Sequence, residues 1–412
     1  MATLAVTWRG SPLTDPRIIT DAKEHFGRIV EQQLERVEQL KQAEGWTDFA
    51  KIKTINIGIL GGDGIGPYIG TEARRVLEHL LREPVNQGNV VFRNIEGLTI
   101  ENRAHHMMSI PNEVLGEIKR CHVTLKGPTH TPEKGDSWPN LESANVSMRK
   151  ALDLFANVRP VRIPQEGIDW TFFRENTEDL YAVGSQGINI TDDLAMDFRV
   201  ITTQGSERII DAAFAYAKRN NKTRVTIVTK ANIIKTTDGK FLDIARKIST
   251  KYPDIGWDAW YIDIMTAKLL DRSRRNEFQV FALPNLYGDI ITDEAAQIQG
   301  GVGTAGSANI GKKHSMFEAI HGSAPRMVQE GRSQYADPSS MIRAGAMMLD
   351  HIGYPGSAER LNKALDICTQ YERKVVTTGR STGATGKELG DYIMDTVEDS
   401  TLESRWENYI QE

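Results

Sequence analysis

The sequence has few cysteines, no long apolar run and no excess of positive charge, and each absence excludes a class of protein. The 412 residues include only two cysteines, Cys121 and Cys368, too few for a disulfide-stapled domain or a cysteine-rich metal knuckle. No run of about 18 apolar residues predicts a membrane span, and residues 1–20 lack the apolar core of a signal peptide. With 50 Lys and Arg against 55 Asp and Glu, the net charge of −5 argues against nucleic acid as a partner. We therefore expect a cytoplasmic protein.

Residues 1–50 form a predicted helical extension. Acidic residues outnumber basic ones there, unlike in an organelle-targeting peptide. Between Asp21 and Gly45, apolar residues recur at steps of three and four, which is typical of an amphipathic helix with one buried stripe. We expect this helix to pack on the body of the protein or on a second subunit. A regulatory or partner-binding arm is the alternative.

From Lys53 onward, short apolar runs alternate with segments of helical periodicity. This alternation predicts an α/β architecture in which helices cover a largely parallel sheet. The predicted strands span residues 54–60, 90–92, 122–126, 224–229 and 279–283. The predicted helices span residues 67–81, 112–120, 145–155, 206–219, 238–251, 290–299 and 340–351.

A glycine-rich turn, Gly61-Gly-Asp-Gly-Ile-Gly66, follows the first predicted strand. Such glycines can let the backbone approach a pyrophosphate at a helix N-terminus. The spacing differs from GxGxxG, however, and no acidic residue ends a second strand about 20 residues later. We therefore expect a structural turn, with a phosphate cradle as the alternative, and not a standard Rossmann fold.

Two aspartates, Asp289 and Asp293, are four residues apart at the start of a predicted helix, so both should lie on one face. Because like charges repel, this pair suits a hard divalent cation such as Mg²⁺ or Mn²⁺. The alternative is that acids are simply favoured at a helix N-terminus by its dipole.

Three arginines, Arg149, Arg159 and Arg174, stand in otherwise apolar segments. If they lie together, they suit a substrate with several carboxylates, each held by charge-assisted hydrogen bonds. Three independent surface ion pairs are the alternative. Lys230 ends a predicted strand, where burial can lower the pKa of an amine and fit it for proton transfer. Tyr181 is a candidate proton donor.

Several long motifs occur in the order found in the β-decarboxylating dehydrogenases, the family of isocitrate, isopropylmalate and homoisocitrate dehydrogenases. They are Gly62-Asp-Gly-Ile-Gly-Pro67, Lys126-Gly-Pro128, Asn157-Val-Arg-Pro-Val-Arg162, Phe173-Arg-Glu-Asn-Thr-Glu178, Asn285-Leu-Tyr-Gly-Asp289, Gly306-Ser-Ala-Asn-Ile-Gly311 and His321-Gly-Ser-Ala-Pro325. The chain resembles this family from about residue 54 to about residue 392. The resemblance implies an isocitrate/isopropylmalate dehydrogenase-like α/β fold of two domains. The large domain would be discontinuous, at 51–154 and 300–412, and the small domain, at 155–299, would carry a dimer arm near 184–200.

The helix expected to open the substrate site, Ser143-Ala-Asn145-Val-Ser-Met-Arg149, is similar to the Ser-x-Asn-x-x-x-Arg pattern of isocitrate enzymes. Isopropylmalate enzymes have apolar residues there, whereas a hydroxyl and an amide suit the γ-carboxylate of isocitrate. The resemblance therefore implies the oxidative decarboxylation of isocitrate to 2-oxoglutarate and CO₂, a reaction of the tricarboxylic acid cycle. Homoisocitrate, 3-isopropylmalate or another 3-substituted malate is the alternative substrate. A non-catalytic regulatory subunit is an alternative of a different class.

The resemblance also implies a role for each matching residue. The catalytic residues would be Tyr181, Lys230 and Asp289, with Tyr181 protonating the enolate and Lys230 donated across a homodimer. The substrate carboxylates would be bound by Ser143, Asn145, Arg149, Arg159 and Arg174. Mg²⁺ or Mn²⁺ would be held by Asp289 and Asp293, with Asp263 from a second subunit. Of the cofactor-binding residues, Thr131, Asn232 and Glu318 would lie near the nicotinamide. The adenosine side would be bound by His321, Gly322, Ser323, Ala324, Pro325, Arg326 and Asp337.

The choice between NAD and NADP depends on the residues that follow Pro325. In the family, NAD enzymes usually carry an aspartate there and NADP enzymes often carry a Lys-Tyr pair. This chain has Arg326-Met327. Because a guanidinium can bind a 2′-phosphate and cannot accept a hydrogen bond from a 2′-hydroxyl, we expect NADP rather than NAD.

Overall fold

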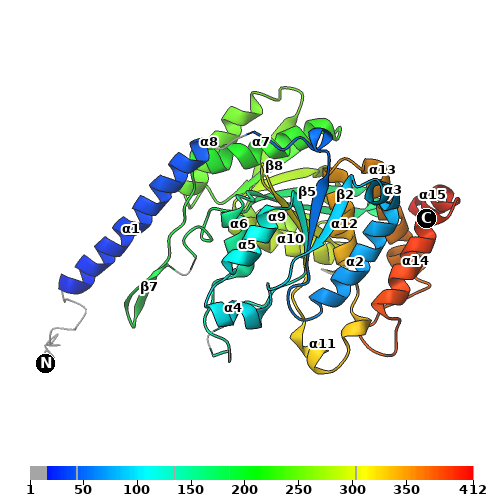
Figure 1. Cartoon of the computed structure of the whole chain (residues 1–412). Coiled ribbons are helices and arrows are strands. Elements are labelled where there is room, and N and C mark those ends of the chain that lie inside the picture. Colours follow the sequence, from blue (N-terminus) through cyan, green and yellow to red (C-terminus); the bar gives the residue numbers. More distant parts are fainter. Residues whose placement is uncertain (1–15, 43–44, 134, 185, 302–303, 412) are drawn as a thin grey trace, which may run out of the picture.

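One ten-stranded sheet runs through the protein, in the order β2-β1-β3-β12-β11-β4-β5-β10-β8-β9 (Figure 1). The computed structural model describes residues 16–42, 45–133, 135–184, 186–301 and 304–411, so the first 15 residues of the predicted extension lie outside the described residues. The strands of the sheet are β1 (Ile55–Leu60), β2 (Val90–Asn94), β3 (Val123–Lys126), β4 (Ala156–Ile163), β5 (Ile168–Glu175), β8 (Arg224–Thr229), β9 (Gly256–Tyr261), β10 (Val280–Leu283), β11 (Gly306–Ile310) and β12 (Ser315–Ala319). The pairings β12–β11, β11–β4 and β4–β5 at the centre are antiparallel. The flanking pairings are parallel, which agrees with the predicted α/β fold.

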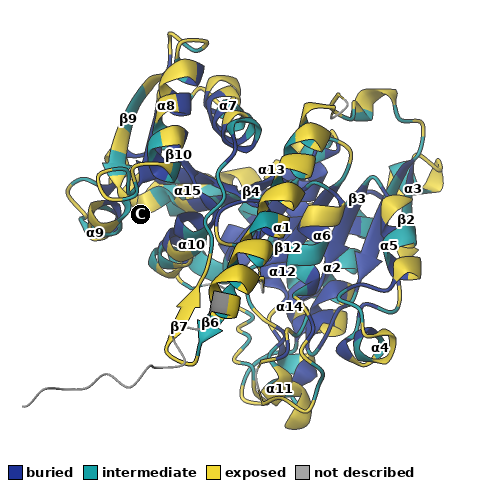
Figure 2. Ribbon diagram, turned by 90° about the vertical axis from the view of Figure 1, so that its left-hand side faces the viewer, coloured by how far each residue is buried: buried dark blue, intermediate teal, exposed yellow. Residues whose placement is uncertain are grey.

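Helices cover both faces of the sheet, and their outer surfaces are exposed (Figure 2). On the β2–β11 half, one face is covered by α2 (Gly66–Leu80), α12 (Ser339–His351), α13 (Pro355–Asp366) and α14 (Gly386–Glu398). The opposite face is covered by α5 (Asn112–Lys119) and α6 (Ala144–Ala151). On the β4–β9 half, α7 (Thr203–Arg219) and α8 (Thr237–Ser249) cover one face, and α9 (Ile262–Leu270) and α10 (Asn285–Gln299) the other.

Shorter elements complete the described chain. They are α3 (Arg82–Asn86), α4 (Ile100–His106), α11 (Pro325–Gln329), α15 (Leu402–Gln411), the short turns Phe49–Lys51, Pro164–Glu166, Arg275–Glu277 and Ser333–Tyr335, and a π-helical turn at Ile367–Tyr371. No helix among the described residues is long and apolar enough to cross a membrane.

The two faces of the sheet follow from the period of two in its strands. In β10, Ala282 packs under α7 and α8, whereas its neighbours Phe281 and Leu283 pack toward α9 and α10. A strand buried on both faces, such as β10, reads as a continuous apolar run, which is why β10 was predictable from sequence.

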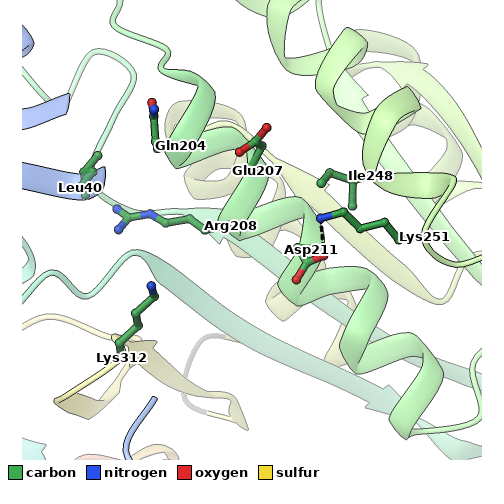
Figure 3. A pocket seen from close by; sticks show the side chains of 8 residues that line it. All are labelled: Leu40, Gln204, Glu207, Arg208, Asp211, Ile248, Lys251 and Lys312. Atoms are coloured by element: carbon green, nitrogen blue, oxygen red, sulfur yellow. Dashed lines mark ion pairs between the residues drawn. The ribbon is translucent and has the colours of Figure 1, made fainter. Parts of the chain in front are cut away.

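A long helix and a hairpin lie beside each other at one edge of the molecule (Figure 1). The helix, α1 (Pro16–Lys41), falls within the predicted extension, and the hairpin of β6 (Ile188–Thr191) and β7 (Leu194–Met196) falls within the predicted arm. Near the end of α1, Leu40 lines a cavity of about 250 Å³ with Arg208 and Lys312 (Figure 3). The packing of α1 on the body agrees with the first of the two expectations for this helix.

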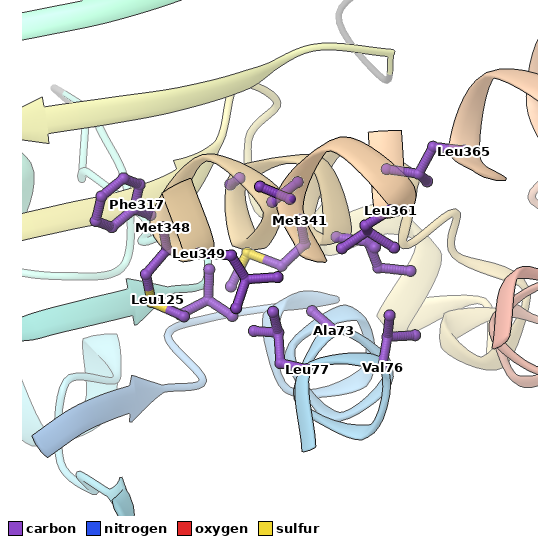
Figure 4. Packing of buried hydrophobic residues seen from close by; sticks show 14 of the residues in the cluster. Ala73, Val76, Leu77, Leu125, Phe317, Met341, Met348, Leu349, Leu361 and Leu365 are labelled. Atoms are coloured by element: carbon purple, nitrogen blue, oxygen red, sulfur yellow. The ribbon is translucent and has the colours of Figure 1, made fainter. Parts of the chain in front are cut away.

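The largest apolar core lies between α2 and α12 (Figure 4). Ala73 and Leu77 of α2 face Met341 and Leu349 of α12, and Phe317 joins them from the sheet. This core joins strands that are far apart in the sequence, because β12 lies next to β3 in the sheet. The proposed division into domains at 51–154, 155–299 and 300–412 stays a prediction.

Candidate active site

The helix that carries Asp289 and Asp293, α10, begins at Asn285, five residues before the predicted start. The prediction was wrong there because asparagine and glycine are weak helix formers. Gly288 is needed for packing, since a Cβ on it would approach the Cγ of Arg174 to 2.5 Å. Because α10 begins at Asn285, both aspartates lie beyond its first turn, which contains no acidic residue. The helix dipole, which favours acids in the first turn, does not account for them.

Two buried arginines compensate the charge of the aspartate pair. Arg174, at the end of β5, pairs with Asp289 and donates from its Nε to the Oδ1 of Asn285 at 2.9 Å. Arg159, in β4, places its Nη1 2.9 Å from the Oδ1 of Asp293 and its Nη2 3.9 Å from the Oδ1 of Asp289. Burial, followed by the charge of nearby Arg149, lowers the pKa of Arg174 to about 10, so it stays charged at neutral pH. These arginines are thus not surface ion pairs.

The phenol of Tyr181 belongs to the same group. Its OH donates to the Oδ2 of Asp289 at 2.7 Å, and the guanidinium carbon of Arg174 lies 5.4 Å from the centre of its ring. Burial and then the hydrogen bond to Asp289 raise the pKa of Tyr181 to about 12. Burial alone would raise the pKa of Asp289, but the charge of Arg174 and the Tyr181 hydrogen bond outweigh it and lower that pKa. At neutral pH the site therefore holds a protonated phenol against a carboxylate.

A second buried charged group lies where α6 meets the sheet. The Oε2 of Glu318 is 3.1 Å from the Nζ of Lys126, and its Oε1 is 3.4 Å from the Nη2 of Arg149. The amide of Asn309 donates to Oε1 at 2.8 Å. Burial would raise the pKa of Glu318, but the two cations outweigh it and lower the pKa to about 2. Glu318, predicted to lie near the nicotinamide, thus directly contacts the predicted substrate ligand Arg149.

A cavity of about 270 Å³ opens beside these groups. Among the residues that line it are Thr131, Ser143 and Tyr181, which were singled out for three different roles. Ser143 is the N-cap residue of α6, yet within the described residues its hydroxyl makes no capping hydrogen bond. Asn145 accepts a hydrogen bond from the hydroxyl of Thr129 at 3.1 Å. The hydroxyl of Ser143 is therefore available to a ligand.

Lys230 and Asp263 form a pair of their own. The Nζ of Lys230 is 2.7 Å from the Oδ2 of Asp263 and 5.6 Å from the ring centre of Tyr261. Within the described part of one chain, no group of three or more His, Cys, Asp or Glu side chains is placed to hold a metal ion. A single chain therefore does not assemble Asp263 with Asp289 and Asp293.

The glycine-rich turn packs against the loop predicted to bind adenosine. The N–H of Ile65 donates to the carbonyl of Ser323 at 3.0 Å, and a Cβ on Gly64 would lie 1.9 Å from that oxygen. Gly64 also has a φ of +62°, which favours glycine. These glycines allow close contact between backbones, as the prediction of a structural turn expected.

The other predicted cofactor residues lie around α11 and on an exposed loop. His321, Gly322, Ser323 and Ala324 form the turn between β12 and α11, and Ala324 has a φ of +46°. Arg326 is 84% exposed and pairs with Glu330 at 2.7 Å. Asp337 accepts a hydrogen bond from the N–H of Ser339 at 2.8 Å and from the hydroxyl of Thr377 at 2.5 Å. Asn232 is exposed after β8.

Some residues of the site had no predicted role. Asn309 accepts hydrogen bonds from the amides of Asn157 and Asn176, both at 2.9 Å, while its own amide donates to Glu318. Asn157 in turn accepts from the Nε of Arg159 at 3.0 Å. These asparagines and Lys126 all stand in the recognised motifs, which was the only signal available in the sequence.

Glu175 gives the site a testable pH dependence of stability. Burial and then the charge of Glu178 raise its pKa from 4.5 to about 7. The contribution of Glu175 to folding is therefore complete below about pH 4.5 and is lost as the pH rises through 7. We expect the stability of Glu175→Gln relative to the wild type to increase from pH 5 to pH 8, measured by urea unfolding. The exposed Glu113→Gln variant is the control, and a difference independent of pH would contradict this expectation.

The fold and these motifs define a family. The model of the isocitrate/isopropylmalate dehydrogenase family matches residues 56–393, and the chain belongs to this family of NAD(P)-dependent β-decarboxylating dehydrogenases. It is 39% identical over 317 residues to isocitrate dehydrogenase [NADP] of Rickettsia prowazekii (strain Madrid E), a match that spans 75% of this chain but only 62% of that relative. It is 32% identical over 359 residues to homoisocitrate dehydrogenase of Methanocaldococcus jannaschii, covering 83% of this chain and 98% of that relative. The crystal structure of isocitrate dehydrogenase from Methylococcus capsulatus has a TM-score of 0.73 and 35% identity, covering 84% of this chain and 100% of that one.

Proposed function

We propose that this chain catalyses the oxidative decarboxylation of isocitrate to 2-oxoglutarate and CO₂, with hydride transfer to NADP⁺. One observation carries the proposal: Arg159, Arg174 and Tyr181 converge on Asp289, and Tyr181 also lines a cavity with Ser143. Guanidinium groups suit the carboxylates of a polycarboxylic acid. The free hydroxyl of Ser143 suits the γ-carboxylate, which an apolar residue would leave without a hydrogen bond.

The protonation states of these groups support a distinct role for each side chain. Tyr181 keeps its proton at neutral pH and is placed as the general acid for the enolate that follows loss of CO₂. Arg149, held by Glu318, and Arg159, held by Asn157, are oriented by buried partners before a substrate binds. An intact set of these residues favours a catalytic chain over a regulatory one.

Two residues of α10, Asp289 and Asp293, are suited to be ligands of a divalent metal ion. The side chains of Asp289 and Asp293 are 38% and 59% exposed, lie one helical turn apart and supply the hard oxygen donors that Mg²⁺ and Mn²⁺ prefer. In one chain their charge is balanced by Arg159 and Arg174. Such an ion, when bound, supplies a Lewis acid for the new carbonyl.

A homodimer would complete this site. Lys230 and Asp263 are both partly exposed and pair with each other rather than with the Asp289 group of their own chain. We infer that each pair serves the site of the other subunit, where Asp263 is the third metal ligand and Lys230 assists removal of the hydroxyl proton. Exposed apolar side chains around this pair, Ile233, Tyr261 and Ile264, suit contact with a second copy.

Isocitrate is tested against its closest competitor by a direct assay. With Mg²⁺ and isocitrate, we expect NADP⁺ to be reduced to NADPH, which is measured as a rise in absorbance at 340 nm. The rise should be much slower with homoisocitrate or 3-isopropylmalate. Homoisocitrate is the second candidate, because Ser143 also suits its distal carboxylate and the homoisocitrate relative matches over almost its whole length. Activity with 3-isopropylmalate alone would contradict the role of Ser143.

Arg326 is expected to select NADP⁺. Its guanidinium is exposed at the start of α11, and its ion pair with Glu330 is exposed as well, so a 2′-phosphate can approach it from solvent. Arg326→Ala should lower kcat/KM for NADP⁺ by about 10-fold or more, the effect of losing one charge-assisted contact, and leave kcat/KM for NAD⁺ within about twofold. Lys387→Ala, which removes an exposed cation on α14, is the control. An equal loss with both cofactors would contradict selection by Arg326.

A further inference from the structure

The helix α1 lies outside the residues matched by the family model, yet it is firmly attached to the family fold. Ile29 on its inner face is 4% exposed, and Phe26 packs on Phe198 with ring centres 5.1 Å apart. The ring of His25 forms a hydrogen bond with the carbonyl of Gln186 at 2.8 Å. Beyond the helix, the N–H of Thr47 donates to the carbonyl of Lys312 at 2.8 Å. These contacts fix the register of α1 on the body.

One cation of α1 reaches into the body. The Nη1 of Arg36 is 3.1 Å from the Oε1 of Glu178, and its Nη2 donates to the hydroxyl of Thr177 at 2.9 Å. The Arg36 side chain is 22% exposed, whereas that of Glu178 is 1% exposed. Arg36 therefore uses both arms of its guanidinium on one buried turn of the chain.

That turn holds two buried carboxylates close together. Glu175 accepts hydrogen bonds from the N–H groups of Thr177 and Glu178, at 2.9 and 2.5 Å, and Glu178 accepts from the N–H of Thr202 at 2.9 Å. Arg208 of α7 approaches Glu175 to 3.9 Å and donates to the hydroxyl of Thr177 at 2.8 Å. Figure 3 shows the guanidinium of Arg208 extending from α7 toward Leu40 at the end of α1, and both side chains line the same cavity. Arg208 is also bonded to Asp153 at 2.8 Å. Without Arg36, the two buried glutamates would therefore keep one nearby guanidinium, which they share with Asp153.

The same turn positions the proposed active site. The carbonyl of Glu178 accepts a hydrogen bond from the amide of Asn285 at 3.3 Å, and Asp179 accepts from the N–H of Leu286 at 2.9 Å. Both contacts are at the first turn of α10, the helix of Asp289 and Asp293. Two residues after Asp179, Tyr181 donates to Asp289. A shift of the turn at 175–179 would therefore move the proposed proton donor and the proposed metal ligands together.

We propose that Arg36 is a positioning residue, through which the N-terminal helix holds the turn at 175–179 and thereby places Tyr181 against Asp289. The residue acts through Thr177 and Glu178 and touches no substrate. The kinetic part of this inference rests on the proposed function, whereas the ordering of the turn does not.

The test compares Arg36→Met with Lys41→Met, which removes an exposed cation of the same helix that pairs only locally with Glu38 among the described residues. Hydrogen–deuterium exchange is followed well below the unfolding temperature in peptides that span 175–181 and 285–293. Arg36→Met should speed exchange in both peptides by about 10-fold, because a local opening becomes easier, and Lys41→Met should change neither. Faster exchange confined to α1 would overturn the proposal.

Kinetic measurements then distinguish a positioning role in catalysis from a purely structural role of Arg36. Arg36→Met should lower kcat by about tenfold with KM for isocitrate changed less than about twofold, since a displaced proton donor affects the reaction more than binding. Arg36→Lys keeps the charge but replaces the two-armed planar guanidinium with a single nitrogen on a shorter side chain, so it should hold Glu178 and Thr177 less well and its kcat should be intermediate. This variant also serves if Arg36→Met does not fold. An unchanged kcat alongside faster exchange would overturn the positioning role. If the wild type is inactive with every acid tested, the proposed function fails while the exchange result still decides the ordering of the turn.

Discussion

An equimolar mixture of Lys230→Met and Tyr181→Phe chains is expected to regain about a quarter of the wild-type activity, because random pairing makes half of the dimers mixed and each mixed dimer has one intact site of two. Each variant alone should lose roughly 100-fold or more in kcat, the usual effect of removing a general acid or base. The expectation rests on the separation of two groups within one chain. Tyr181 is bonded to Asp289, whereas Lys230 is bonded to Asp263.

A matched mixture distinguishes complementation from other causes of recovery. Tyr181 and Asp289 belong to the same site of the same chain, so mixing Tyr181→Phe with Asp289→Asn should restore nothing. Native mass spectrometry would show whether mixed dimers form in both experiments. Mixed dimers of Lys230→Met and Tyr181→Phe without recovered activity would contradict the shared site.

Glu318→Gln is expected to lower the free energy of unfolding by about 3–5 kcal/mol, the usual result of breaking a buried ion pair and leaving its cation unpaired. Glu318 is 6% exposed and faces two cations, Lys126 and Arg149, of which Lys126 is fully buried. The exposed pair of Glu117 and Arg120 offers the control, because Glu117→Gln should cost less than about 1 kcal/mol. Urea unfolding at pH 7 measures both values.

The pH dependence of the same variant gives an independent check. The folded-state pKa of Glu318 is lowered to about 2 from 4.5, so its stabilisation is present above about pH 4.5 and is lost as the pH falls toward 2. The difference in stability between the wild type and Glu318→Gln should therefore shrink on acidification. A difference of less than about 1 kcal/mol at pH 7 would show that Lys126 and Arg149 find other partners.

Much of the fold could be predicted because its signals are local. The buried strand β10 is a continuous apolar run, and β8 is rich in β-branched residues. The spacing of Asp289 and Asp293 correctly placed both on one face of α10. The start of α10 could not be predicted, since its first turn, with Asn285 and Gly288, depends on packing against Arg174 rather than on helix propensity.

The partners within the site could not be derived from spacing. Lys126 and Glu318 are 192 residues apart, and Arg174 and Asp289 are 115 residues apart. Only the family resemblance gathered these positions, and it gave no role to Asn157, Asn309 or Arg36. The pairing of Arg36 with Glu178 lies wholly beyond motif reasoning, because α1 is outside the matched family region.

The central position of two late strands has a consequence for synthesis on the ribosome. In the finished sheet β12 and β11 separate β3 from β4, yet they follow β3 in the chain by about 180 residues. Until they leave the exit tunnel, β3 and β4 each keep an open backbone edge, which is a template for wrong pairing with other nascent chains. Closure of the sheet must therefore wait for residues 306–319, and we expect chains truncated before them to aggregate rather than fold as a shortened unit.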